Sequence, residues 1–327
     1  MSNHCRRQWA QQYGAGAVVC LVPPHGNAAE LATQEAFVAE GIQCVPGDLR
    51  RCPVAEHLEG PWDVVFHLAA ATDTSLSEQE LAPVNVQGTV NLLASLHGQL
   101  SGQRLVFTST SAAVDRPSRP DGPLTESSPC RPRTAYGRSK LAAEHIVRAW
   151  CAREQVDYTI VRLTTLYGPG VRTGLISVLA DGLRQRRLSA RLHWPGRVSL
   201  LFVEDAVRLL FFLAASPQAA NETFFLTSGE AVRVGDVARQ IAELIDVPAK
   251  PLMLPAWCWW LARQLAWMPG LTRLVPWRLL HVLHDGLWCD NAKVRRVYPF
   301  RLVPLDEGLA RTFDRGTATR SQVSVHG

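Results

Sequence analysis

Lysine is scarce in this chain of 327 residues, which has only three lysines among its 34 basic residues. Arginine therefore carries most of the positive charge, and the formal net charge is only +5. The arginines are scattered, apart from a short run at residues 184–187. A nucleic-acid-binding face needs a basic patch or stripe. We therefore expect no nucleic-acid partner, and interpret the charge as a solvated surface that can also accept a phosphate-bearing ligand.

Three further absences narrow the class of protein. The eight cysteines lie far apart without any Cys-x-x-Cys pair, the start lacks a secretory apolar segment, and no run approaches 18 uninterrupted apolar residues. These features predict reduced thiols in the cytoplasm, no metal site and no membrane-spanning helix. The apolar fraction of 47% is sufficient for a large core.

The most informative pattern is Tyr136-Gly137-Arg138-Ser139-Lys140. If Thr134 starts a helix, residues four apart share a face, so the Tyr136 phenol and the Lys140 ammonium point into the same space. A phenol near pKa 10 is a poor acid or base at neutral pH, and a fixed cation beside it is expected to lower that pKa. With five tyrosines and three lysines, chance gives about 0.05 such pairs.

The segment around this pair resembles the active-site region of the extended short-chain dehydrogenases/reductases, the NAD(P)-dependent epimerase/dehydratase group. The matching residues are Leu124-Thr125-Glu126 and Pro132-x-x-x-Tyr136-Gly137-x-Ser139-Lys140-Leu141-Ala142-Ala143-Glu144, and further matches run from about Val18 to about Phe313. The resemblance implies an α/β fold, a Rossmann-type doubly wound parallel sheet with a smaller C-terminal substrate lobe. It also implies a small-molecule substrate, an NAD(P) cofactor and a homodimer.

The sequence departs from the family at its start. Residues 17–22 match the second strand, so the first strand and its Gly-x-x-Gly-x-x-Gly turn would lie about 20–30 residues earlier, before Met1. Gly14-Ala15-Gly16 is no substitute, because it precedes a strand. Either a truncated start of the sequence or a family member with crippled cofactor binding would account for the missing glycine turn. The second strand ends at Val22-Pro23-Pro24-His25 without a ribose-binding acid, which favours NADP slightly.

The resemblance also assigns cofactor contacts. Asp48 would bind the adenine amine, and a turn aspartate is its ordinary alternative. A buried strand that ends in small residues places Ala69 and Ala70 near the adenosine and pyrophosphate. The implied cofactor-binding residues are Asp48, Leu49, Leu68, Ala69, Ala70, Asn85, Tyr136, Lys140 and Thr165.

The strand expected at 104–111 ends in a run of hydroxyl side chains. Ligands of α/β sheets bind at the carboxyl ends of strands, and the family places a Ser or Thr there to bond the reacting oxygen. Thr110 fits best, and Ser109 and Ser111 are alternatives, because a slip of one residue reverses the face. The expected catalytic residues are thus Tyr136, Lys140 and Thr110, and the expected substrate contacts are Ser111, Thr164 and Arg197.

Beyond residue 170 the alternation of strands and helices weakens. We expect an N-terminally short cofactor domain at 1–169, a substrate lobe at 170–315 with brief returns to the sheet, and a tail at 316–327. Six of the ten tryptophans lie between residues 252 and 289. They could face a lipid-like substrate or a membrane interface, or fill the core of the lobe or a subunit contact.

The resemblance implies an NAD(P)-dependent oxidoreductase or epimerase that transfers hydride at a carbinol or carbonyl carbon. The substrate would be a nucleotide sugar, as in most of the group. The tryptophans favour an apolar alcohol or ketone, steroid-like or flavonoid-like. The missing glycine turn leaves open a non-catalytic member that acts as an interaction protein.

Overall fold

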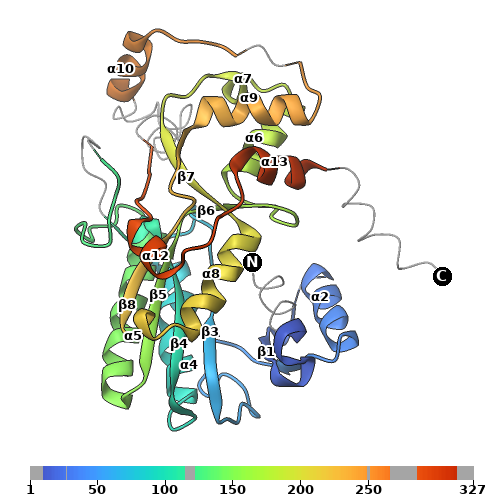
Figure 1. Cartoon of the computed structure of the whole chain (residues 1–327), viewed down its shortest axis with the longest axis vertical. Helices are drawn as coiled ribbons and strands as arrows, with labels where there is room; N and C mark the ends of the chain where they lie inside the picture. The colour runs from blue at the N-terminus through green and yellow to red at the C-terminus, as the bar shows by residue number, and fades with distance from the viewer. Residues whose placement is uncertain (1–9, 27, 115–121, 249–250, 266–285, 315–327) are drawn as a thin grey trace, which may run out of the picture.

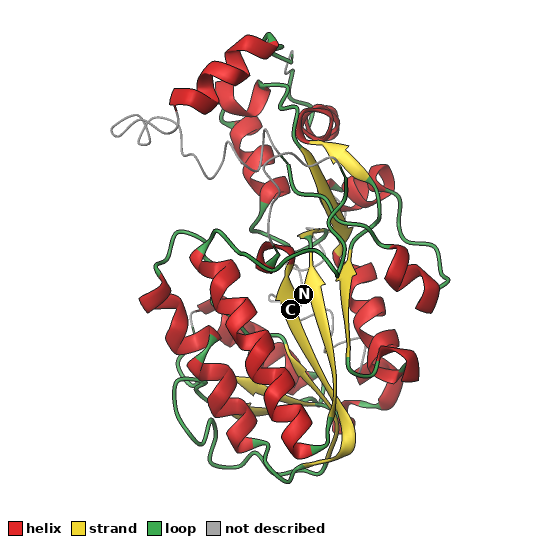
Figure 2. Ribbon diagram, turned by 90° about the vertical axis from the view of Figure 1, so that its left-hand side faces the viewer, coloured by secondary structure: helices red, strands yellow, loops and turns green. Residues whose placement is uncertain are grey.

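The main sheet has four parallel strands. The computed structural model describes residues 10–26, 28–114, 122–248, 251–265 and 286–314. The strands are β3 (Trp62–His67), β4 (Leu100–Thr110), β5 (Asp157–Leu163) and β8 (Glu222–Leu226), and they are hydrogen-bonded in that order. Parallel strands need crossovers, which here are helices (Figures 1 and 2).

Helices cover both faces of this sheet. Leu105 and Phe107 of β4 pack in one cluster with α4 (Gln87–Ser95) and α5 (Ala135–Glu154). Val106, on the opposite face, packs with α8 (Val203–Ala215). Successive strand residues face opposite sides, so an apolar run suits a strand buried on both faces. The predicted doubly wound α/β fold is confirmed.

The segment around Asn85 is not one continuous helix. It contains two helices, α3 (Glu78–Asn85) and α4, with Val86 as their shared cap. Pro83 lies inside α3 and lacks the N–H that would continue the ladder. Ser77 begins α3 with a capping box, in which the Ser77 and Glu80 side chains bond each other's backbone N–H.

The residues before β3 form a separate small layer. It contains η1 (Ala15–Ala17), β1 (Val19–Val22), α2 (Ala28–Ala39) and β2 (Gln43–Pro46), and β1 pairs in parallel with β2. Val18, Cys20 and Val22 pack with Phe37 of α2 in a cluster of their own. Figure 1 shows this layer beside the main sheet.

A second region lies at the carboxyl ends of the main strands (Figure 1). Its sheet contains β6 (Thr165–Tyr167), β7 (Arg197–Phe202) and β9 (Ala231–Arg233), in that order. Its helices are α6 (Leu175–Arg184), α7 (Leu188–Arg191), α9 (Val234–Leu244), α10 (Ala256–Leu265) and α13 (Leu305–Phe313). Two other short helices, η3 (Pro217–Ala219) and α12 (Ala292–Val297), contact strand β8 of the main sheet instead. The core of the second region packs Trp194 against Trp259, with ring centroids 4.8 Å apart.

The six tryptophans of residues 252–289 do not share one environment. Trp259 is buried in the lobe core, whereas Trp257 and Trp260 of α10 are 65% and 63% exposed. Trp267 and Trp277 lie outside the described residues. Within the described part of the chain, no helix combines the length and apolarity needed to cross a membrane.

Candidate active site

Helix α5 begins where the sequence predicts. Thr134 is the N-cap, and its hydroxyl accepts a hydrogen bond from the Gly137 N–H at 3.0 Å. Tyr136 and Lys140 are one helical turn apart, so they share the face that begins at this terminus. Tyr136 is half-buried and Lys140 is 2% exposed.

The first turn of α5 rests on the short helix η2 (Ser111–Ala113), which follows β4. Gly137 makes this contact possible. A Cβ on Gly137 would lie 2.2 Å from the Ala112 carbonyl oxygen, which is closer than atoms can approach. The Tyr-Gly dipeptide thus brings the tyrosine helix against the hydroxyl-rich end of β4.

The three hydroxyls at the end of β4 have different environments. Ser109 is buried and donates to Glu144 Oε1 at 2.6 Å, and Ser111 is also buried. Thr110 is half-buried, and its hydroxyl accepts from the Ala112 N–H at 3.2 Å. A hydroxyl that accepts keeps its own proton for donation, and the role of Thr110 at a substrate oxygen stays a prediction.

The pKa of Tyr136 shifts in the direction opposite to the predicted one. Burial raises the pKa of Tyr136 to about 12. Burial also lowers the pKa of Lys140 to about 7, although the negative charge of Glu144 opposes that change. The Lys140 Nζ lies 4.2 Å from the centroid of the Phe107 ring, a cation–π contact with β4. Burial therefore disfavours the charged form of both groups.

Sequence reasoning missed a buried ionic network on the same face of α5. Glu144 is fully buried and accepts from Arg162 Nε at 2.9 Å, Arg162 Nη2 at 2.8 Å, Arg148 Nη2 at 3.1 Å and Ser109. Burial alone would raise the pKa of Glu144, but the bonds from Arg162 and Ser109, with the charge of Arg148, lower it. The spacing of Tyr136, Lys140 and Glu144 at i, i+4 and i+8 was the available signal.

Asn85 fastens the loop after β3 to α5. Its Oδ1 accepts from the Ala71 N–H at 2.8 Å, and its Nδ2 donates to the Ala71 carbonyl and to Ser139 Oγ, both at 3.0 Å. Asn85 thus holds the backbone beside Ala69 and Ala70 in a fixed position relative to the Tyr136 helix.

His67 is a core histidine. Its Nε2 bonds Thr89 Oγ1 at 3.0 Å, and the Thr89 hydroxyl donates to the Asn85 carbonyl. Burial, with a smaller effect of Lys140, lowers the pKa of His67 to about 3. The ring therefore stays neutral at physiological pH.

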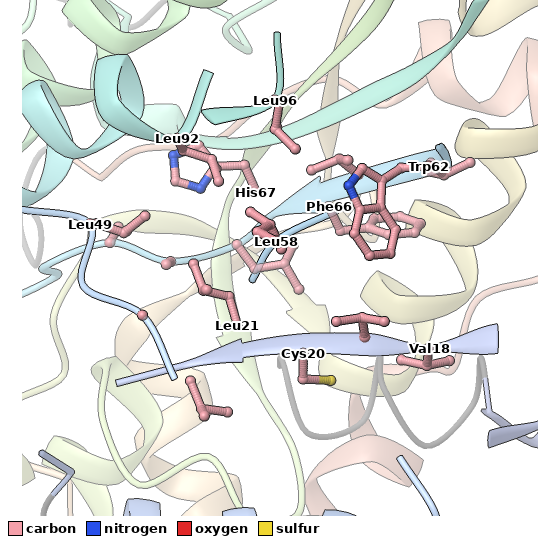
Figure 3. Close-up of a pocket in the computed structure, with 18 of the residues that line it drawn as sticks. Val18, Cys20, Leu21, Leu49, Leu58, Trp62, Phe66, His67, Leu92 and Leu96 are labelled. Atoms are coloured by element: carbon pink, nitrogen blue, oxygen red, sulfur yellow. The ribbon is translucent and has the colours of Figure 1, made fainter. Parts of the chain in front are cut away.

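Five predicted cofactor residues line one cavity at the carboxyl ends of β2 and β3: Asp48, Leu49, Leu68, Ala69 and Ala70. The Arg50 side chain donates a hydrogen bond to the Asp48 carboxylate, and this bond is the main reason that the pKa of Asp48 is lowered. Figure 3 labels Leu49 and His67 among the residues that line this cavity. Tyr136, Lys140 and Thr165 are not among the residues lining this cavity.

The remaining predicted residues lie where the four-stranded main sheet meets the three-stranded sheet of the second region, or beyond that point. Thr164 is buried and donates to the Leu226 carbonyl at 2.9 Å, which ties β5 to β8. Thr165 is half-buried at the start of β6. Arg197 is the exposed first residue of β7, opposite Arg233. Its contact with a substrate stays a prediction.

The model of the NAD dependent epimerase/dehydratase family matches residues 9–235. The chain belongs to this family. Among its relatives is the UDP-glucose 4-epimerase of Vibrio cholerae, 28% identical over 202 residues, which covers 60% of this chain and 61% of that protein. The dTDP-L-rhamnose 4-epimerase of Burkholderia thailandensis is 28% identical over 240 residues, covering 58% of this chain and 65% of that protein. The chain thus spans less than two thirds of either epimerase.

A third relative aligns along nearly the whole chain. The 3beta-hydroxysteroid-dehydrogenase/decarboxylase isoform 1 of Arabidopsis thaliana is 25% identical over 328 residues, covering 94% of this chain and 73% of that protein. Among solved structures, the UDP-glucose 4-epimerase of Thermotoga maritima has a TM-score of 0.72 at 17% identity and covers 97% of this chain and 96% of that chain. At that identity the structural likeness confirms the fold alone.

Proposed function

We propose that this family member is an NAD(P)-dependent oxidoreductase or epimerase acting at a carbinol or carbonyl carbon. The observation that carries the proposal is the packing of the Tyr136 helix on η2, which brings Tyr136 beside the Thr110 end of β4. A phenol and a hydroxyl at a strand end form the arrangement that proton transfer at a substrate hydroxyl requires.

The chain's own groups would divide the work. Tyr136 would accept the proton of the substrate hydroxyl or return it to the carbonyl oxygen, and Thr110 would donate a hydrogen bond to that oxygen. A phenol with a pKa near 12 is a weak acid and stays protonated at neutral pH, so forming its phenolate needs a nearby cation. Lys140 is the buried cation one turn along α5, and its charge would stabilise the phenolate.

The described residues fit part of a dinucleotide. The cavity bearing Asp48 and the small residues Ala69 and Ala70 would hold the adenosine end, and Lys140 would bond the nicotinamide ribose. When bound, NAD(P) supplies or takes the hydride. The described residues contain no Gly-x-x-Gly-x-x-Gly turn, so they offer no glycine-rich pyrophosphate cradle.

A nucleotide sugar is the first proposed substrate, supported by the printed activities of the two epimerase relatives. An apolar alcohol or ketone is the second candidate. It is favoured by the exposed Trp257 and Trp260, and by the alignment with the plant steroid dehydrogenase along nearly the whole chain.

Calorimetric titration with NADPH and then NADH tests the proposal first. We expect micromolar binding of one cofactor, followed by turnover of either UDP-glucose or a 3-hydroxysteroid. Tyr136→Phe should keep cofactor affinity within about twofold and reduce turnover by at least a hundredfold, because only the phenolic hydroxyl that carries the proton is lost. A folded chain that binds neither cofactor at millimolar concentration would refute the enzyme proposal and support the interaction-protein alternative.

A further inference from the structure

Cys130 lies on the loop that leads into the tyrosine helix α5, shortly before the N-cap Thr134. The side chain of Cys130 is partly exposed, whereas Cys20, Cys151 and Cys289 are buried. A small oxidant in solution can therefore reach the Cys130 sulfur. The loop joins this sulfur directly to the helix that carries the candidate active site.

A buried arginine side chain bonds the Cys130 sulfur. Arg162 Nη2 donates to Cys130 Sγ at 3.2 Å, and the Arg162 side chain is only 3% exposed. Arginine is always charged in proteins, and burial reduces the screening of that charge by the solvent. Hydrogen bonds from a charged donor are stronger than those from a neutral one. Negative charge that develops beside this sulfur would therefore be stabilised.

One nitrogen of the same guanidinium has no partner. Arg162 binds Glu144 side-on, through Nε at 2.9 Å and Nη2 at 2.8 Å. The guanidinium is planar and its five N–H groups form a fixed fork, so the second Nη2 N–H and the Nη1 group share the other end. Nη1 is buried and lacks a hydrogen-bond partner in the part of the chain that the structure describes. The end of the guanidinium that bonds Cys130 thus offers an unused donor.

The charges around this fork suit one further acceptor. Glu144 is shared by Arg162 and Arg148, so two guanidinium groups meet one carboxylate. A buried donor or cation without a full set of partners is unfavourable, so an added acceptor beside Arg162 would be stabilising. An oxygen bound to the Cys130 sulfur would be such an acceptor, because it would lie one bond length from an atom that Arg162 already bonds.

We propose that Cys130 is a site of oxidation by hydrogen peroxide to a sulfenic acid, and that the Arg162 guanidinium binds the added oxygen. The sulfur attacks one peroxide oxygen, so an S–O bond forms as the O–O bond breaks. The sulfur is oxidised by two electrons and the peroxide is reduced. The departing hydroxide takes up the thiol proton and leaves as water. The sulfenic oxygen would accept a hydrogen bond from Arg162 Nη1. This inference is independent of the proposed reaction.

Labelling with dimedone, a reagent for sulfenic acids, tests the site. The reduced full chain receives equimolar hydrogen peroxide without cofactor or substrate, and mass spectrometry quantifies each cysteine peptide. We expect Cys130 to be labelled at least about tenfold faster than Cys258, the matched control. Cys258 on α10 is also partly exposed, and among the described residues no arginine bonds its thiol. Labelling of Cys130 at the rate of Cys258, or more slowly, would overturn the proposal.

A conservative substitution tests the role of the guanidinium. Arg162→Lys keeps a positive charge beside Glu144 but removes the planar pair of N–H groups at the end that bonds Cys130. The rate of Cys130 labelling should fall at least about fivefold, and that of Cys258 should not change. Cys130 labelling at the wild-type rate would overturn the assignment to Arg162. If this variant does not fold, the comparison of Cys130 with Cys258 in the wild-type chain still decides whether Cys130 is the site.

Discussion

Gly137 lies against the backbone of Ala112, where a Cβ would come within 2.2 Å of the carbonyl oxygen. This contact joins the tyrosine helix α5 to the end of β4, and so sets the position of Tyr136 relative to Thr110. The obstacle is backbone rather than a flexible side chain, so the structure cannot relieve it by a rotamer change.

The first prediction follows from that contact. Gly137→Ala should lower the free energy of unfolding by about 1–3 kcal/mol, because added atoms force two backbone segments apart. It should also reduce turnover more than cofactor affinity. Urea denaturation measures the first effect and steady-state kinetics the second. Gly16→Ala is the matched control, because nothing lies within 4 Å of its Cβ position. Equal stability of the two variants would contradict the packing argument.

The burial of Lys140 predicts a dependence of stability on pH. Its pKa is about 7 in the folded chain and 10.5 ordinarily, so between these values the unfolded chain binds more protons. Stability due to this group therefore rises with pH above 7. Relative to Lys140→Met, the wild-type free energy of unfolding should increase by about 2–3 kcal/mol from pH 7 to pH 9.

Chemical denaturation at several pH values measures this difference. The comparison with Lys140→Met cancels the contributions of other titrating groups to the pH dependence of stability, such as Cys151, whose pKa is raised by burial. A difference that does not vary with pH would show that Lys140 keeps its ordinary pKa. Arg148→Met serves as a control for removing a cation at a half-exposed position on the same helix.

The sequence predicted the fold well because strand and helix periodicity are local. The strands expected at residues 17–22 and 104–111 correspond to β1 (Val19–Val22) and β4 (Leu100–Thr110). The start of α5 follows from Thr134, whose capping signal is also local.

The site was less predictable, because its electrostatics depend on burial and on contacts distant in sequence. The four-residue spacing predicted that Lys140 lies near Tyr136. The spacing alone could not predict that desolvation raises the pKa of Tyr136. The bond between Ser109 and Glu144 joins residues 35 positions apart, so no local pattern reveals it.

The Glu144 network predicts a large loss of stability when its anion is removed. Glu144→Gln would leave the Arg162 guanidinium, 3% exposed, without its negative partner, and should cost about 3–5 kcal/mol. Arg148→Met should cost less than about 1 kcal/mol, because Arg148 is partly solvated. Thermal and urea unfolding compare the two.

The same carboxyl predicts acid sensitivity. The pKa of Glu144 is lowered below its ordinary 4.5 in the folded chain. The carboxylate therefore contributes to the free energy of unfolding above pH 4.5, and this contribution is lost as the pH falls through the pKa of the folded chain. Glu144→Gln should therefore reduce the loss of stability between pH 5 and pH 3. An unchanged acid profile in this variant would assign the acid sensitivity to other carboxyls.

The tryptophans of α10 give the last prediction, because one helix presents them to two environments. Trp257 and Trp260 are three residues apart and share the exposed face, whereas Trp259 packs on Trp194 in the lobe core. Trp259→Ala should lower the free energy of unfolding by about 3–5 kcal/mol. The double variant Trp257→Ser and Trp260→Ser should change it by less than about 1 kcal/mol and remove most of the acrylamide-quenchable fluorescence of α10. A large loss of stability in the double variant would mean that this face is packed against protein, as in a subunit contact.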